Sequence, residues 1–153
     1  MKNLSRFFVG AASLVLLTAC GPSKVSYATF HEKAVAAVEK APEYKKVTAK
    51  GTVKAASVEL KLDCVFEKKD SGWELTKGDA ISGSAASIYL SMTADLIPED
   101  NETTYYAGNG FKVTTNSEDS KGYITWNASG YITAIKVDAK DSGNMNVKFS
   151  WSK

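Results

Sequence analysis

Few residues of this chain carry side chains suited to catalysis or metal binding, and the two cysteines, Cys20 and Cys64, are the most reactive of them. A cysteine thiol can close a disulfide, act as a nucleophile, bind a metal or carry a lipid. Only one histidine, His31, is present to assist such chemistry as a base or as a second ligand. The residues around each cysteine therefore decide which role it has.

The segment before Cys20 has the features of an export signal. Residues 1–6 contain Lys2 and Arg6 and no acidic residue, and an apolar run over residues 7–17 follows them. Such a run is too short to cross a hydrocarbon core about 30 Å thick as a helix. A basic start followed by a short apolar centre is instead typical of a signal peptide. We expect residues 1–19 to be removed on export.

The residues Leu17-Thr18-Ala19-Cys20 resemble the lipobox of bacterial membrane lipoproteins. This resemblance implies that the Cys20 thiol carries a diacylglycerol, whose acyl chains, such as palmitate, anchor the mature protein. Each buried CH₂ group contributes about 0.8 kcal/mol, so two or three acyl chains hold a protein stably on a membrane. The alternative is a cysteine that stands by coincidence beside an ordinary cleavage site. We expect a lipid-anchored protein on the extracytoplasmic face of a cell membrane, with the choice between inner and outer membrane left open.

The chain after the signal peptide is expected to form one domain. Residues 20–26 are predicted to be the lipidated cysteine and a short tether, and residues 27–153 a single extracytoplasmic α+β domain. No later apolar run reaches the eighteen residues of a membrane-spanning helix. A domain of this length can bury enough apolar surface to fold without a disulfide or a metal.

Removal of the signal peptide changes the charge balance. Lys2 and Arg6 are two of the 19 basic residues, whereas all 17 acidic residues follow Cys20, so the mature chain has no formal net charge. Nucleic-acid binding depends on clustered lysines and arginines that neutralise phosphates. From a neutral domain with interspersed charges we expect no nucleic-acid partner.

The remaining reactive residues indicate no enzyme. Cys64 lies in an alternating apolar pattern and is expected to be a buried structural residue, while His31 stands near a predicted helix start and is expected to be solvated. The acidic residues Glu99, Asp100 and Glu102 lack the spacing of an EF-hand and are expected to form a solvated loop. The motifs of serine hydrolases, zinc proteases and phosphate-binding loops are absent from the sequence. We therefore predict no catalytic residue, no metal site and no cofactor other than the acyl chains on Cys20.

Hydrophobic periodicity predicts the elements of the domain. Thr29 and Glu32 form a capping-box pattern for a helix that ends near Ala41, before Pro42. A second helix is predicted over residues 84–97, with Ser84 as its cap and Pro98 after its end. Alternating apolar residues and turn signals predict strands in the regions 47–55, 58–66, 73–75, 103–107, 111–115, 123–127, 131–139 and 145–151.

The order of these elements, α-βββ-α-βββββ, predicts an α+β fold. It is a curved antiparallel meander sheet of about eight strands, with an N-terminal helix and one inserted helix packed on one face. This arrangement resembles the half-barrel lipid-carrying lipoproteins of the LolA and LppX type. The resemblance implies a cavity for an apolar ligand between the sheet and the helices.

The aromatic residues of the strands are the candidate binding residues. Most are expected to fill the core, and a surplus could line a groove between sheet and helices that accepts an apolar ligand or a sugar. We single out Trp126, Tyr89, Tyr105 and Tyr106 for this groove. The predicted function is a non-catalytic module of a lipoprotein that binds a ligand or a protein partner at the bacterial cell envelope. The alternatives are an interaction or scaffold subunit of an envelope complex without a small ligand, and an enzyme of unrecognised type.

Overall fold

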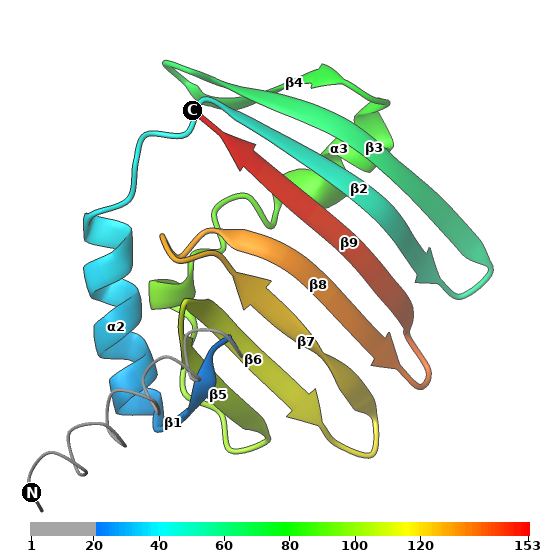
Figure 1. Ribbon diagram of the computed structural model, residues 1–153. Helices are drawn as coiled ribbons and strands as arrows, with labels where there is room; N and C mark the ends of the chain where they lie inside the picture. The colour runs from blue at the N-terminus through cyan, green and yellow to red at the C-terminus, as the bar shows by residue number, and fades with distance from the viewer. Residues whose placement is uncertain (1–20) are drawn as a thin grey trace, which may run out of the picture.

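The computed structural model describes residues 21–153, which form one nine-stranded antiparallel sheet, two helices and a 3₁₀ turn (Figure 1). The strands are β1 (Ser23–Val25), β2 (Lys46–Ala55), β3 (Val58–Lys69), β4 (Gly72–Lys77), β5 (Thr103–Gly108), β6 (Gly110–Asn116), β7 (Ser120–Trp126), β8 (Ile132–Ala139) and β9 (Gly143–Ser152). The helical elements are α2 (Tyr27–Glu39), α3 (Ala80–Ser87) and η1 (Ala94–Leu96). The α+β class with a curved antiparallel sheet is confirmed. The predictions for the signal peptide and for Cys20 concern residues outside the described part.

The sheet consists of two meanders joined side by side. Its strand order is β1-β5-β6-β7-β8-β9-β2-β3-β4, so β5 to β9 form one meander and β2 to β4 the other. The last strand, β9, pairs with β2 along its length, with Phe149 opposite Ala49. This pairing joins the two meanders in the middle of the sheet.

The first strand corrects the predicted tether. Residues 23–25 pair antiparallel with residues 107–105 of β5, so the sheet has nine strands where eight were expected. Ser26 then caps helix α2, because its hydroxyl oxygen accepts a hydrogen bond from the Thr29 amide at 3.2 Å. The predicted capping box at Thr29 is therefore wrong by one turn. Within the described residues, only Gly21 and Pro22 precede the folded domain.

The second helix also differs from the prediction. Helix α3 begins after Asp79, whose carboxylate accepts a hydrogen bond from the Ser82 amide at 2.9 Å, and it ends at Ser87. The chain then continues in turns to η1, because two of its backbone groups bind β7 and the turn after it, and the others form short-range turn bonds instead of a helix. The Ala94 amide donates to the Gly130 carbonyl at 2.9 Å, and the Met92 carbonyl accepts from the Trp126 indole at 2.7 Å.

The two helices cover different parts of one sheet face, which we call the inner face. Helix α2 packs on β5 and η1, while α3 packs on β3 and β4 (Figure 1). Phe30 of α2 is fully buried, with its ring 5.2 Å from that of Tyr105, 5.6 Å from Phe111 and 6.2 Å from Trp126. One continuous core thus lies within residues 21–153, and we expect this segment to fold as an independent unit.

No helix in this described part is long and apolar enough to cross a membrane.

Two glycines allow neighbouring strands to approach closely. A Cβ atom on Gly51 would overlap the carbonyl oxygen of Asn146 in β9, and one on Gly122 would overlap the carbonyl oxygen of Lys136 in β8. Both glycines lie on the inner face, where their missing side chains let the backbone bend. They contribute to the curvature of the four central strands.

Candidate functional site

The helices leave one end of the inner face only partly covered. Toward the turns that follow β2, β6 and β8, the inward residues Val53, Ile124, Val137 and Met145 are half-buried. The inward residues further along the same strands, such as Val147, are fully buried. The apolar surface of the core therefore continues past the helices and reaches solvent.

This exposed end of the core forms a groove of about 310 Å³, which we call the inner groove. Its lining is Val53, Lys54, Ala55, Tyr89, Ile124, Ile135, Val137, Ala139, Ser142, Gly143, Asn144 and Met145. Tyr89, from the turn after α3, forms part of the wall and lies 6.4 Å from the Phe149 ring. Lys54 and Asn144 border the groove, but their side chains point to the outer face. An apolar lining with a few polar groups is the usual chemistry of a site for a small apolar ligand.

The structure separates the four aromatic residues predicted to bind. Tyr89 alone lines the inner groove. Trp126 is 2% exposed and Tyr105 is 6% exposed, and both fill the core next to Phe30. The Tyr105 hydroxyl is held by the amide of Asp100 at 2.7 Å.

Tyr106 points to the opposite, outer face of the sheet, in register with Lys112. The aliphatic residues of the groove, Val53, Ile124, Val137 and Met145, were missed by the sequence analysis. Their alternation placed them on the inner face, but only the positions of the helices show that they lie beyond the covered area.

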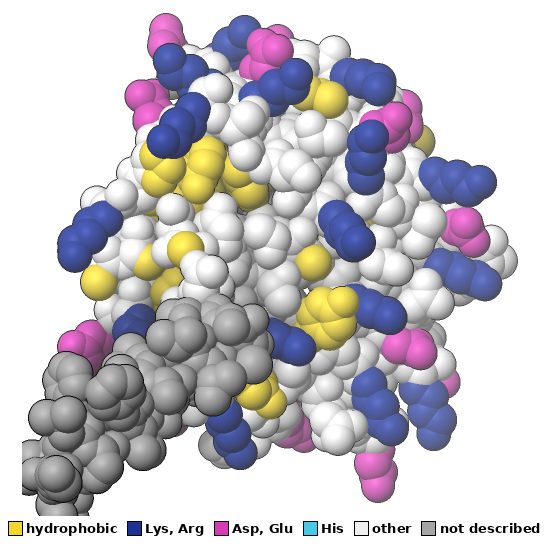
Figure 2. Space-filling view, viewed as in Figure 1, with side chains coloured by type: hydrophobic (Ala, Val, Ile, Leu, Met, Phe, Trp, Pro, Cys, Tyr) yellow, Lys and Arg dark blue, Asp and Glu magenta, His cyan; other side chains and the backbone are white. Residues whose placement is uncertain are grey.

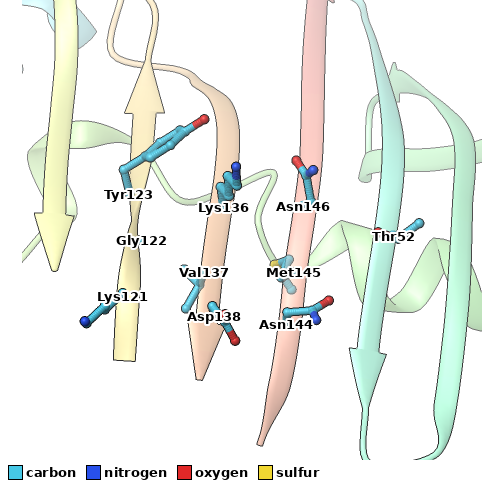
Figure 3. A pocket seen from close by; sticks show the side chains of 10 residues that line it. All are labelled: Thr52, Lys121, Gly122, Tyr123, Lys136, Val137, Asp138, Asn144, Met145 and Asn146. Atoms are coloured by element: carbon cyan, nitrogen blue, oxygen red, sulfur yellow. The ribbon is translucent and has the colours of Figure 1, made fainter. Parts of the chain in front are cut away.

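The outer face carries a second, more polar hollow of about 520 Å³, which we call the outer hollow. Figure 3 shows its side chains in two rows across β7, β8, β9 and β2. One row is Tyr123, Lys136, Asn146 and Thr52, and the other is Lys121, Asp138 and Asn144. The backbone at Gly122, Val137 and Met145 lies between the rows. Two lysines, amides, a hydroxyl and one tyrosine ring, beside the single carboxylate of Asp138, suit a polar group better than an apolar one.

Two residues considered for chemistry in the sequence, Cys64 and His31, line neither hollow. Cys64 is fully buried beside Ala49, and burial raises the pKa of its thiol, as expected for a structural cysteine. The amide hydrogen bond from Ser82 lowers the pKa of Asp79, which serves as the cap of α3. The His31 ring lies 5.8 Å from that of Tyr27. Among residues 21–153, no group of three His, Cys, Asp or Glu side chains could hold a metal ion.

Comparisons with protein-family models, with curated proteins and with solved structures found no match for this chain. The assignment of a function therefore depends on the sequence and on the geometry described above.

Proposed function

We propose that this protein is a lipid-anchored lipoprotein of the bacterial cell envelope whose domain binds a small apolar molecule in the inner groove without catalysis. The observation that carries this proposal is the uncovered apolar end of the core, with Val53, Ile124, Val137 and Met145 half-buried around one hollow. The anchor is supported by the lipobox-like residues that end at Cys20.

The groove is suited to an apolar ligand for a simple energetic reason. Each square ångström of apolar surface removed from water contributes about 25 cal/mol, so a ligand that covers this groove gains from its own burial and from that of the groove. Its volume of about 310 Å³ is at the small end of the range for ligand sites. A compact apolar molecule or one short acyl chain fits this description.

A second function is favoured by a separate observation. Ile81 of α3 and Ile88 just after it are 69% and 70% exposed, which is unusual for large apolar side chains. A protein partner that packs on α3 would cover them, as expected for an interaction subunit of an envelope complex. This alternative predicts a protein ligand and leaves the inner groove unused.

The proposal can be tested with a fluorescent apolar probe and two matched variants. Met145→Glu places a carboxylate in the inner groove, whereas Asn146→Glu adds the same charge to the next residue of β9, on the outer face. Because a charge in an apolar site is costly, we expect Met145→Glu to weaken probe binding about tenfold or more. Asn146→Glu should bind the probe as the wild type does.

Thermal unfolding of both variants shows whether the fold is kept. Equal probe affinity in the wild type and in a folded Met145→Glu variant would contradict the proposal. So would a wild-type protein that fails to bind any of a series of apolar probes.

A further inference from the structure

The outer face of the sheet concentrates positive charge. Over seven adjacent strands, from β1 through β5 to β9 and on to β2, eight lysines occupy outward positions and Asp138 is the single acidic residue at such a position. The lysines are Lys24, Lys46, Lys50, Lys54, Lys112, Lys121, Lys136 and Lys148. Figure 2 views this face and shows the blue lysine side chains spread across it, with the magenta acidic side chains mainly toward its margins.

Most acidic residues lie at the borders of this region. Asp95 lies in η1, and Glu99, Asp100 and Glu102 lie between η1 and β5. On the outer face of β3, Glu59, Asp63 and Glu67 lie opposite Lys54, Lys50 and Lys46 of β2. Of the eight outward lysines, Lys50 is the one that forms an ion pair within residues 21–153, with Asp63 at 4.0 Å. The part of the outer face that runs from β1 through β5 to β9 therefore carries five lysines, Lys24, Lys112, Lys121, Lys136 and Lys148, against the single carboxylate of Asp138. The charges remain interspersed on β2 and β3 and are segregated over β1 and β5 to β9.

Tyrosines accompany these lysines. The Lys112 ammonium lies 5.0 Å from the centre of the Tyr123 ring and 5.9 Å from that of Tyr106. Tyr123 and Lys136 also border the outer hollow. Lysine and tyrosine both combine an apolar stem or ring with a polar end, a combination found at membrane–water interfaces.

We infer that the outer face docks on the surface of an anionic phospholipid membrane. Seven strands spaced about 4.8 Å apart give a contact face about 30 Å wide, over which the lysines can approach many headgroups at once. The outer hollow offers Lys121, Lys136 and Asn146 to a headgroup phosphate. Each lysine near an anionic leaflet contributes about a fivefold increase in binding.

The position of β1 agrees with this docking. Lys24 lies on the outer face at the edge strand, four residues after Cys20. A lipid on Cys20, as proposed above, would hold this edge at the membrane and let the lysine face lie on it. The docking itself requires neither the lipid nor the ligand of the inner groove. A nucleic acid could also bind a face rich in lysines, but it is disfavoured here because the predicted signal peptide exports the chain.

Vesicle sedimentation of residues 21–153 tests the inference without the anchor. We expect binding to phosphatidylcholine vesicles that contain about 30% phosphatidylglycerol and none to phosphatidylcholine alone, since only the former carry a negative surface potential. The binding should weaken as salt rises above about 0.1 M, where charges more than about 10 Å apart are screened.

Two variants that lose the same number of positive charges show whether vesicle binding depends on the outer face or only on the net charge of the protein. The first changes Lys112, Lys121, Lys136 and Lys148 to Gln, and the second changes the exposed residues Lys33, Lys40, Lys140 and Lys153 to Gln. We expect the first variant to lose about 100-fold or more in vesicle binding and the second to change less than tenfold. Thermal unfolding is measured on both, and a destabilised variant is replaced by the single substitutions Lys121→Gln and Lys136→Gln.

Several results would overturn the inference. These are no binding of the wild type to anionic vesicles, an equal loss in both variants, or binding to double-stranded DNA as tight as that to the vesicles. None of these results bears on the inner groove, which is tested by the apolar probe.

Discussion

Trp126 and Tyr89 show at the residue scale why an aromatic side chain alone does not identify a binding site. Trp126 donates its indole hydrogen to the Met92 carbonyl at 2.7 Å and packs on Phe30. Both the polar and the apolar part of its side chain therefore have partners within the core. Tyr89 is half-buried and borders open space in the inner groove. The difference comes from the chain after α3, which covers Trp126 and leaves the Tyr89 ring at the edge.

Cys64 provides a prediction about pH. Burial raises the pKa of its thiol above the 9.0 of an exposed cysteine, so the folded state keeps its proton to higher pH than the unfolded state does. The stabilising effect is complete below about pH 9 and is lost as the pH rises through the folded-state pKa.

We expect the free energy of unfolding of the wild type to fall relative to that of Cys64→Ala as the pH rises above 9.0. Urea unfolding of both proteins at several pH values measures this difference. Parallel curves for the two proteins would contradict the assignment of a buried thiol.

Cys20 provides a separate prediction about the anchor. If its thiol carries the lipid, Cys20→Ser should abolish incorporation of a labelled fatty acid and leave the precursor uncut or released from the membrane. Labelling with a palmitate analogue, followed by fractionation of the cells, measures both effects. Retained label in the variant would show that another residue is acylated.

At the element scale, the strands with clear alternation were predictable and the segments fixed by tertiary contacts were not. β2, β3 and β9 appear where alternation places them, because each has one solvent-exposed and one apolar face. The three residues of β1 carry too little pattern to reveal a strand, and they extend only because β5 offers an unpaired edge. The expected helix over residues 84–97 failed because Gly130 and Trp126 bind the backbone of that segment.

The central strands provide a test of how the sheet bends. A Cβ on Gly122 would overlap the backbone of β8, so Gly122→Ala should lower the free energy of unfolding by about 1–3 kcal/mol or more. Gly72→Ala is the matched control, since Gly72 also has a positive φ, of 125°, but nothing within 4 Å of its Cβ position. Urea unfolding of the two variants separates steric overlap from backbone strain. Equal losses would show that φ, and not the close approach of the strands, requires glycine at position 122.

At the scale of the whole molecule, the sheet has two faces of opposite chemistry. The inner face is apolar and ends in a groove, while the outer face carries eight lysines over β1, β2 and β5 to β9 and a polar hollow. The sequence revealed the alternation that creates both faces, and of the groove residues it singled out only Tyr89. It could not reveal the charge segregation, because the balance of acidic and basic residues is a sum over the chain and the strand order is needed to place each lysine.

The measurement that tests the central proposal most directly is native mass spectrometry of the protein purified from the membranes of its own cells. The account predicts one additional mass that is bound without a covalent bond, is removed by organic solvent and is reduced in the Met145→Glu variant. The acyl chains on Cys20 would remain after the same extraction, so the two kinds of lipid are distinguished. A domain that carries no extractable molecule, and that instead co-purifies with a protein covering Ile81 and Ile88, would contradict the account.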